Sequence, residues 1–102
     1  MASIIVEYTF EDGMSDEALS SMAKRLDECL EIRNGTWVRS SLSSDRKRMI
    51  CEFEAPDAES VRDALRSARQ PFDRAWPAQV FSVENYPEAL AKLRKIRAKS
   101  TG

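Results

Sequence analysis

The sequence predicts one α+β domain of ferredoxin-like βαββαβ plan, with a four-stranded antiparallel sheet, both main helices on one face, and an extra C-terminal helix. Three observations support this fold. The chain has 102 residues, the usual size of a single core. Segments of period-two hydrophobicity and segments of helical hydrophobicity follow one another in the order strand, helix, strand, strand, helix, strand. A short turn separates the two middle strands, so they should pair antiparallel. We expect residues 1–84 to form this domain, and residues 85–102 to form a helical extension with a basic tail.

The first half of the chain predicts a strand followed by an amphipathic helix. Residues 3–10 alternate apolar and mostly polar positions, which is typical of a half-buried strand. Ser15 is a suitable helix N-cap, and acidic residues follow it in the first turn. Asn34 and Gly35 provide a stop signal. Between them one apolar stripe recurs at three- and four-residue steps, formed by Leu19, Met22, Ala23, Leu26, Cys29 and Leu30.

The middle of the chain predicts a hairpin and a second helix. Residues 36–43 and 46–54 have strand character, and the turn between them contains Ser43, Ser44 and Asp45. Asp57 is the expected cap of a helix that ends near residue 68.

The last third predicts a strand and a helix. Residues 72–77 are expected to be irregular, and residues 78–83 to form the fourth strand. Pro87 is compatible with the first turn of the final helix. We expect Trp76 to be a core or boundary residue and Arg48 to be solvated.

Composition excludes several classes of function. The chain has 16 basic and 17 acidic residues, interleaved over most of its length, which argues against nucleic-acid binding. The longest apolar run is three residues, far short of the roughly 20 that a membrane helix needs. No signal peptide is visible, so we expect a cytoplasmic protein that contacts no membrane. Histidine is absent, which removes Ser-His and Cys-His mechanisms within one chain. Whether the protein is an enzyme stays open at this stage.

Strand parity predicts which side chains face the helices. Met49, Cys51 and Phe53 form a uniformly apolar set and should lie in the core. On the preceding strand, Val38 and Leu42 should join them. The alternate positions then lie on the helix-free, open face of the sheet: Ile5, Glu7, Thr9, Trp37, Arg39, Ser41, Ile50, Glu52 and Glu54.

Trp37 and Ile50 on an open face would form an exposed hydrophobic patch that favours association. We therefore expect a homodimer in which two sheets meet face to face or close into an α/β barrel. Arg39 could then pair with Glu7, Glu52 or Glu54 in a partly enclosed cavity. Such groups could be ordinary interface ion pairs, or they could form a polar pocket that binds a ligand or performs acid–base chemistry.

Five segments carry a resemblance to a known family: residues 37–42, 50–56, 61–62, Pro71 and 6–10. Together they resemble a family of small bacterial domains of unknown function that includes a nickel-binding, nickel-responsive protein. The Cys-x-x-Glu-Ala-Pro sequence within residues 50–56 is the most specific part. The resemblance implies a ferredoxin-like fold and a dimer.

The resemblance also implies histidine ligands at two positions, which Arg39 and Ala64 occupy in this chain. Guanidinium groups stay protonated and cannot ligate a metal. We therefore assign no metal-binding residues and no cofactor, although nickel is the metal that the resemblance suggests. Arg39 could instead bind a carboxylate or phosphate, so an anionic small molecule is a possible ligand.

Three functions are consistent with these observations. The first is a dimeric binding module whose pocket contains Trp37, Arg39, Ser41, Ile50 and Glu54. The second is a small isomerase or cyclase, in which Glu7 or Glu52 acts as acid or base and Arg39 stabilises a developing anion. The third is a structural or interaction protein without a ligand.

Overall fold

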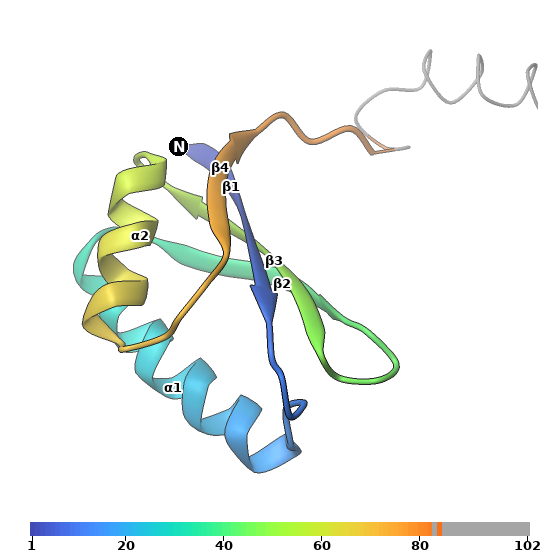
Figure 1. Ribbon diagram of the computed structural model, residues 1–102. Coiled ribbons are helices and arrows are strands. Elements are labelled where there is room, and N and C mark those ends of the chain that lie inside the picture. The colour runs from blue at the N-terminus through green and yellow to red at the C-terminus, as the bar shows by residue number, and fades with distance from the viewer. Residues whose placement is uncertain (83, 85–102) are drawn as a thin grey trace, which may run out of the picture.

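The computed structural model describes residues 1–82 and 84, and their elements follow the order β-α-β-β-α-β (Figure 1). The predicted C-terminal helix and basic tail of residues 85–102 lie outside this part of the chain. The six elements are β1 (Ala2–Thr9), α1 (Asp16–Ile32), β2 (Thr36–Leu42), β3 (Arg48–Ala55), α2 (Ala58–Ser67) and β4 (Arg74–Ala78). The α+β, ferredoxin-like prediction is therefore confirmed. Within the described residues, no helix is long and apolar enough to cross a membrane.

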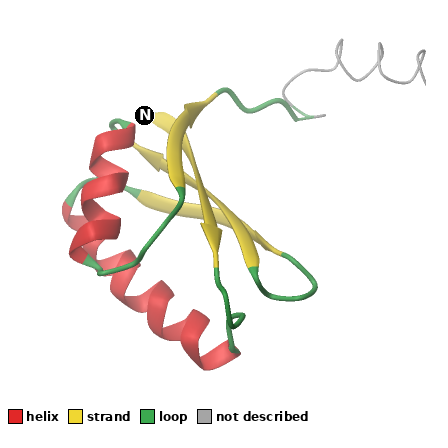
Figure 2. Ribbon diagram, viewed as in Figure 1, coloured by secondary structure: helices red, strands yellow, loops and turns green. Residues whose placement is uncertain are grey.

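The sheet has the strand order β2-β3-β1-β4, and every neighbouring pair is antiparallel. Both helices lie against the same face, so within residues 1–82 and 84 no helix covers the opposite face of the sheet (Figure 2). The two central strands are β3 and β1, so a side chain on their outer face has neighbours on both sides. This open face is where a binding site can form.

Both helices begin where the sequence predicts a cap. The Ser15 hydroxyl accepts a hydrogen bond from the backbone N–H of Ala18, and the Asp57 carboxylate accepts one from Ser60. These bonds satisfy backbone donors that have no partner within the first helical turn. At the end of α1, Asn34 adopts a φ of 58°, the left-handed conformation that asparagine tolerates and that terminates a helix.

The core lies between the helices and the inner face of the sheet. Strand β3 alternates as predicted, with Met49, Cys51 and Phe53 buried and the residues between them facing outward. On β1 the buried residues are Ile4, Val6 and Tyr8, which alternate with Ile5, Glu7 and Thr9. The apolar stripes of the helices complete the core with Met22, Leu26, Leu30, Val61, Ala64 and Leu65.

The fourth strand differs from the prediction. It spans residues 74–78, of which residues 74–77 were expected to be irregular, and not residues 78–83. Pro77 lies opposite Ile4 in the register and argued against a strand at the sequence level. Because β4 pairs only with β1 and forms the edge of the sheet, it can accommodate a proline. Its alternation buries Ala75 and turns Arg74 and Trp76 toward the open face.

The second strand contains a β-bulge that sequence parity did not predict. In its register with β3, Trp37 lies opposite Phe53, whereas Arg39 lies opposite Glu52, so Val38 is an additional residue between them. The prediction that Trp37 lies on the open face is therefore wrong. Its ring packs on the core side against Phe53, with ring centroids 5.6 Å apart. Val38, expected in the core, is 39% exposed.

Candidate pocket on the open sheet face

The open face is organised in two rows of side chains that cross all four strands. The register places Arg39, Glu52, Ile5 and Trp76 in one row, and Ser41, Ile50, Glu7 and Arg74 in the next. In each row a glutamate and an isoleucine occupy the central strands, and an arginine lies on an edge strand beside the glutamate. The order arginine, glutamate, isoleucine begins at β2 in the first row and at β4 in the second. The two rows are therefore related by an approximate two-fold axis through the centre of the face, and this axis relates Arg39 to Arg74. The face thus combines apolar, acidic and basic groups in a regular pattern.

Glu7 is engaged by two residues of β4. The indole N–H of Trp76 donates to Glu7 Oε2 over 2.9 Å, and Arg74 Nε lies 3.4 Å from the same oxygen. Trp76, expected to be a core or boundary residue, is therefore on the open face and 42% exposed. Arg74 and Trp76 are two positions apart, so on one strand they face the same side of the sheet. The sequence could have indicated both partners of Glu7, but the fourth strand was predicted at the wrong residues.

Glu52 is engaged from the opposite edge of the sheet. Arg39 Nε lies 3.5 Å from Glu52 Oε1, and the glutamate side chain is mostly shielded while the arginine is mostly exposed. The structure therefore brings Arg39 together with Glu52 and not with Glu7. Glu54 is exposed near the end of β3, opposite Thr36 and Ser3 in the register.

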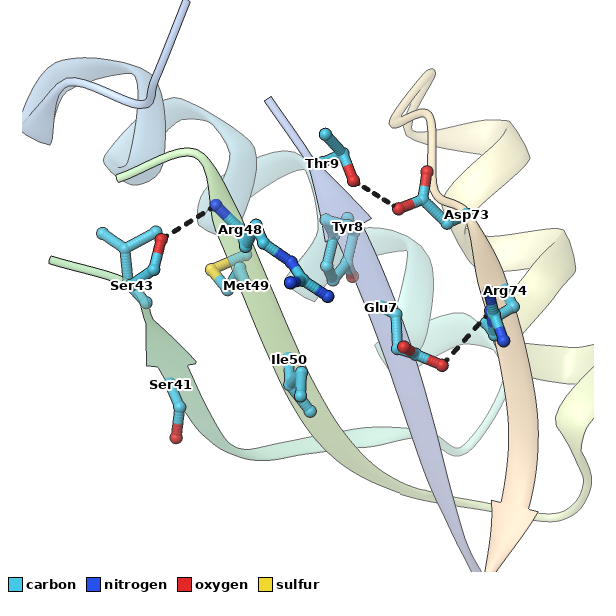
Figure 3. Close-up of a pocket in the computed structure, with 11 residues that line it drawn as sticks. Glu7, Tyr8, Thr9, Ser41, Ser43, Arg48, Met49, Ile50, Asp73 and Arg74 are labelled. Carbon is cyan, nitrogen blue, oxygen red and sulfur yellow. Dashed lines mark hydrogen bonds and ion pairs between the residues drawn. The ribbon is translucent and has the colours of Figure 1, made fainter. Parts of the chain in front are cut away.

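A cavity of about 610 Å³ lies where β1 ends and β3 begins, on the side of the β2–β3 hairpin (Figure 3). This volume is within the range typical of small-molecule sites. Three of the predicted site residues line it: Glu7, Ser41 and Ile50. Trp37, Arg39, Glu52 and Glu54 are outside its lining. The remaining lining residues are Tyr8, Thr9, Leu42, Ser43, Arg48, Met49, Asp73 and Arg74.

The acidic groups of the cavity already have hydrogen-bond partners. The Thr9 hydroxyl donates to Asp73 Oδ2 over 2.6 Å, and the Asp73 backbone N–H donates to the Glu7 carbonyl over 2.8 Å. These two bonds fasten the beginning of β4 to the end of β1. With Glu7 held by β4 as well, the wall of the cavity formed by these two strands is ordered by its own polar contacts.

Arg48 is the lining residue that sequence reasoning assigned to solvent. Its backbone N–H donates to Ser43 Oγ over 3.0 Å, which ties the strand to the hairpin. Its side chain extends across the lining toward β1 (Figure 3). Arg48 is two positions before Ile50 and four before Glu52, so the alternation of β3 places it on the same open face. This alternation was the signal in the sequence that indicated its position.

Beneath the sheet, a short polar chain connects β2, β3 and β1. The Trp37 indole N–H donates to Ser40 Oγ over 2.6 Å, and that oxygen is 2.8 Å from Cys51 Sγ. Burial raises the pKa of the Cys51 thiol to about 11. Burial also raises the pKa of Tyr8; its hydroxyl is electrostatically coupled to Cys51 but makes no hydrogen bond of ordinary geometry. Both groups are therefore neutral near pH 7, and Cys51 is neither a ready nucleophile nor a thiolate ligand.

The fold and this face define the chain as a small ferredoxin-like domain with a pocket of mixed polarity on its open sheet. The model of the family described as nickel-responsive protein SCO4226-like matches residues 5–77, and the chain belongs to this family. The resemblance found in the sequence is thereby confirmed.

A solved structure supports the fold. The chain is similar to the crystal structure of SCO4226 from Streptomyces coelicolor A3(2), with a TM-score of 0.72 and 15% sequence identity. The match covers 79% of this chain and the whole of the other. At this identity the likeness shows the fold alone. None of the curated proteins compared with the chain matches it.

The residues that the structure describes do not fit a nickel site. The sequence contains no histidine, and the described residues include no group of three cysteine, aspartate or glutamate side chains placed to hold a metal ion. The two positions at which the resemblance implies histidine also lie apart. Arg39 is on the open face, whereas Ala64 is fully buried on the helical side of the sheet. A single metal ion within one chain could not reach both.

Proposed function

We propose that the protein is a dimeric domain that binds a small organic molecule on its open sheet face and performs no chemistry on it. The observation that carries this proposal is the cavity of about 610 Å³, whose lining combines Ile50 with serine, threonine, arginine and carboxylate groups. Cavities of this size and polarity suit small-molecule binding. Membership of a nickel-responsive family agrees with a role in sensing or binding, with the ligand changed because imidazole donors are missing.

The dimer part of the proposal rests on what the open face exposes. Ile50 is 50% exposed and Trp76 is 42% exposed, on the face of the sheet opposite α1 and α2. An exposed apolar surface among alternating charges suits contact with a second copy, in which the arginines of one face meet the glutamates of the other. Arg39, Ser41 and Glu54 would then lie at or near the interface and help to enclose the ligand.

An isomerase or cyclase that uses Glu7 or Glu52 is less well supported. A general base needs a carboxylate that is free to reach the substrate proton. Glu7 accepts from Trp76 and pairs with Arg74, and Glu52 pairs with Arg39. These contacts fit ion pairs that organise the face better than they fit acid–base groups.

The test measures mass in solution and ligand binding with the same variants. Ile50→Lys adds a charge to the open face, so we expect sedimentation to change from a dimer to a monomer. Ile32→Lys is the matched control, because Ile32 is 80% exposed at the end of α1 on the helical side. It should remain dimeric. A wild-type protein that is monomeric at micromolar concentration, or an Ile50→Lys variant that remains dimeric, would contradict the dimer.

A further inference from the structure

The charged side chains of the cavity differ in whether they have a bonding partner within the protein. Four charged side chains line it, the acidic Glu7 and Asp73 and the basic Arg48 and Arg74. Glu7 has Trp76 and Arg74 as partners, and Asp73 has Thr9. Among residues 1–82 and 84, the guanidinium of Arg48 has no acidic or carbonyl partner within bonding distance. One cation is thus left to interact with a ligand.

The surroundings of Arg48 are apolar on one side and hydroxylic on the other. Ile50 follows two residues later on the same face of β3, and Ser41 lies opposite Ile50 on β2. The side chain of Arg48 extends toward β1, on the other side of β3 from Ser41 (Figure 3). A guanidinium group offers planar, paired donors that match a carboxylate, sulfonate or phosphate, and its bonds to such groups are strengthened by charge.

We propose that Arg48 is the anion-binding residue of the pocket and that the ligand is an amphipathic anion, with one acidic group on an apolar body. The acidic group contacts Arg48, and the apolar body lies on Ile50. This inference rests on the proposed function and specifies its ligand class. It also moves the anion contact predicted for Arg39 to a different strand, because Arg39 already pairs with Glu52 outside the cavity lining.

Two fluorescent probes test the inference. Anilinonaphthalene sulfonate has an aromatic body with one acidic group, and N-phenyl-1-naphthylamine has nearly the same body without it. We expect the wild-type protein to bind the sulfonate at least tenfold more tightly than the amine. Arg48→Met should abolish this preference and leave binding of the amine unchanged. Lys24→Met, which removes one positive charge from an exposed position of α1, is the control and should keep the preference.

Competition then distinguishes the acidic groups. Decanoate, decyl phosphate and decanol share one chain length, and we expect either anion to displace the sulfonate probe while decanol does not. A lower apparent inhibition constant for decanoate than for decyl phosphate identifies a carboxylate ligand, and the reverse order identifies a phosphate. Equal displacement by all three would overturn the anion site.

The outcomes separate this inference from the proposed function. If both probes bind equally well to the wild type and to Arg48→Met, and Ser41→Phe blocks them by filling the cavity, the pocket stands and the role of Arg48 is wrong. If neither probe binds the wild type, the proposed function fails. Circular dichroism of each variant confirms that it is folded, as expected for exchanges of exposed side chains.

Discussion

The indole nitrogen of Trp76 and a carboxylate oxygen of Glu7 are joined by a 2.9 Å hydrogen bond between residues 69 positions apart in the chain. The bond links the edge strand β4 to the central strand β1 on the face of the sheet opposite α1 and α2. It fixes the carboxylate at one end of the cavity and orients an exposed aromatic ring across the sheet. The same oxygen also faces Arg74, so β4 supplies both of its partners.

Removing the indole donor should weaken this edge of the sheet. We expect Trp76→Phe to lower the free energy of unfolding by about 0.5–1.5 kcal/mol, since the aromatic ring is retained and one hydrogen bond to a carboxylate is lost. Urea denaturation followed by circular dichroism measures the change. In a Glu7→Ala background the same exchange should cost less, because the acceptor is already absent. An equal cost in both backgrounds would show that the bond does not contribute.

The buried thiol gives a dependence of stability on alkaline pH. Burial raises the pKa of Cys51 from 9.0 to about 11, so the folded state holds the thiol proton more tightly than the unfolded state does. Its contribution is complete below pH 9 and decreases as the pH rises toward 11. We expect a loss of roughly 2 kcal/mol over this interval from Cys51, by the linkage of about 1.4 kcal/mol per pKa unit.

Replacing the thiol isolates that contribution. Denaturation of wild type and Cys51→Ala between pH 8 and pH 11 should show a shallower decline in the variant, while the burial-raised pKa of Tyr8 leaves part of the decline in both proteins. Parallel declines would mean that Cys51 keeps its proton no better in the fold than in the unfolded chain. The alanine variant has a lower starting stability because of the lost volume, so the slopes are compared.

Nickel should not stabilise this member of the family. The sequence has no histidine and Cys51 is protonated, and the carboxylates of Glu7 and Glu52 on the open face are each already paired with an arginine. We expect the melting temperature of untagged protein to be unchanged by a tenfold excess of NiCl₂. A saturable rise in melting temperature, reversed by a chelator, would show a metal site that these residues do not predict.

The sequence predicted the layers of the fold and one half of the open face. Period-two alternation placed Ile5 and Glu7 on β1, and Ile50 and Glu52 on β3, because central strands with one buried face constrain register strongly. Both helix caps were also predicted, since a cap depends on residues within one turn.

The edge strands were predicted less well, for different physical reasons. On β2, the bulge at Val38 reverses the parity between Trp37 and Arg39, and no sequence pattern in a seven-residue strand reveals one additional residue. On β4, a proline concealed a five-residue strand that is held by pairing with β1. The partners of Glu7 were missed for this reason, and Arg39 was assigned to a cavity that it does not line.

The bulge at Val38 has a consequence for how such domains change during evolution. If the same residues paired with β3 without a bulge, the ring of Trp37 and the guanidinium of Arg39 would project to the same side of the sheet. Deleting the Val38 codon would instead leave Trp37 and Arg39 adjacent on a regular strand, with each side chain on its present side, so this is a position at which the strand can lose one residue without exchanging its inner and outer sets. Relatives with the same fold but a straight second strand would present a different chemical surface to their ligand or partner, even where the aligned letters agree.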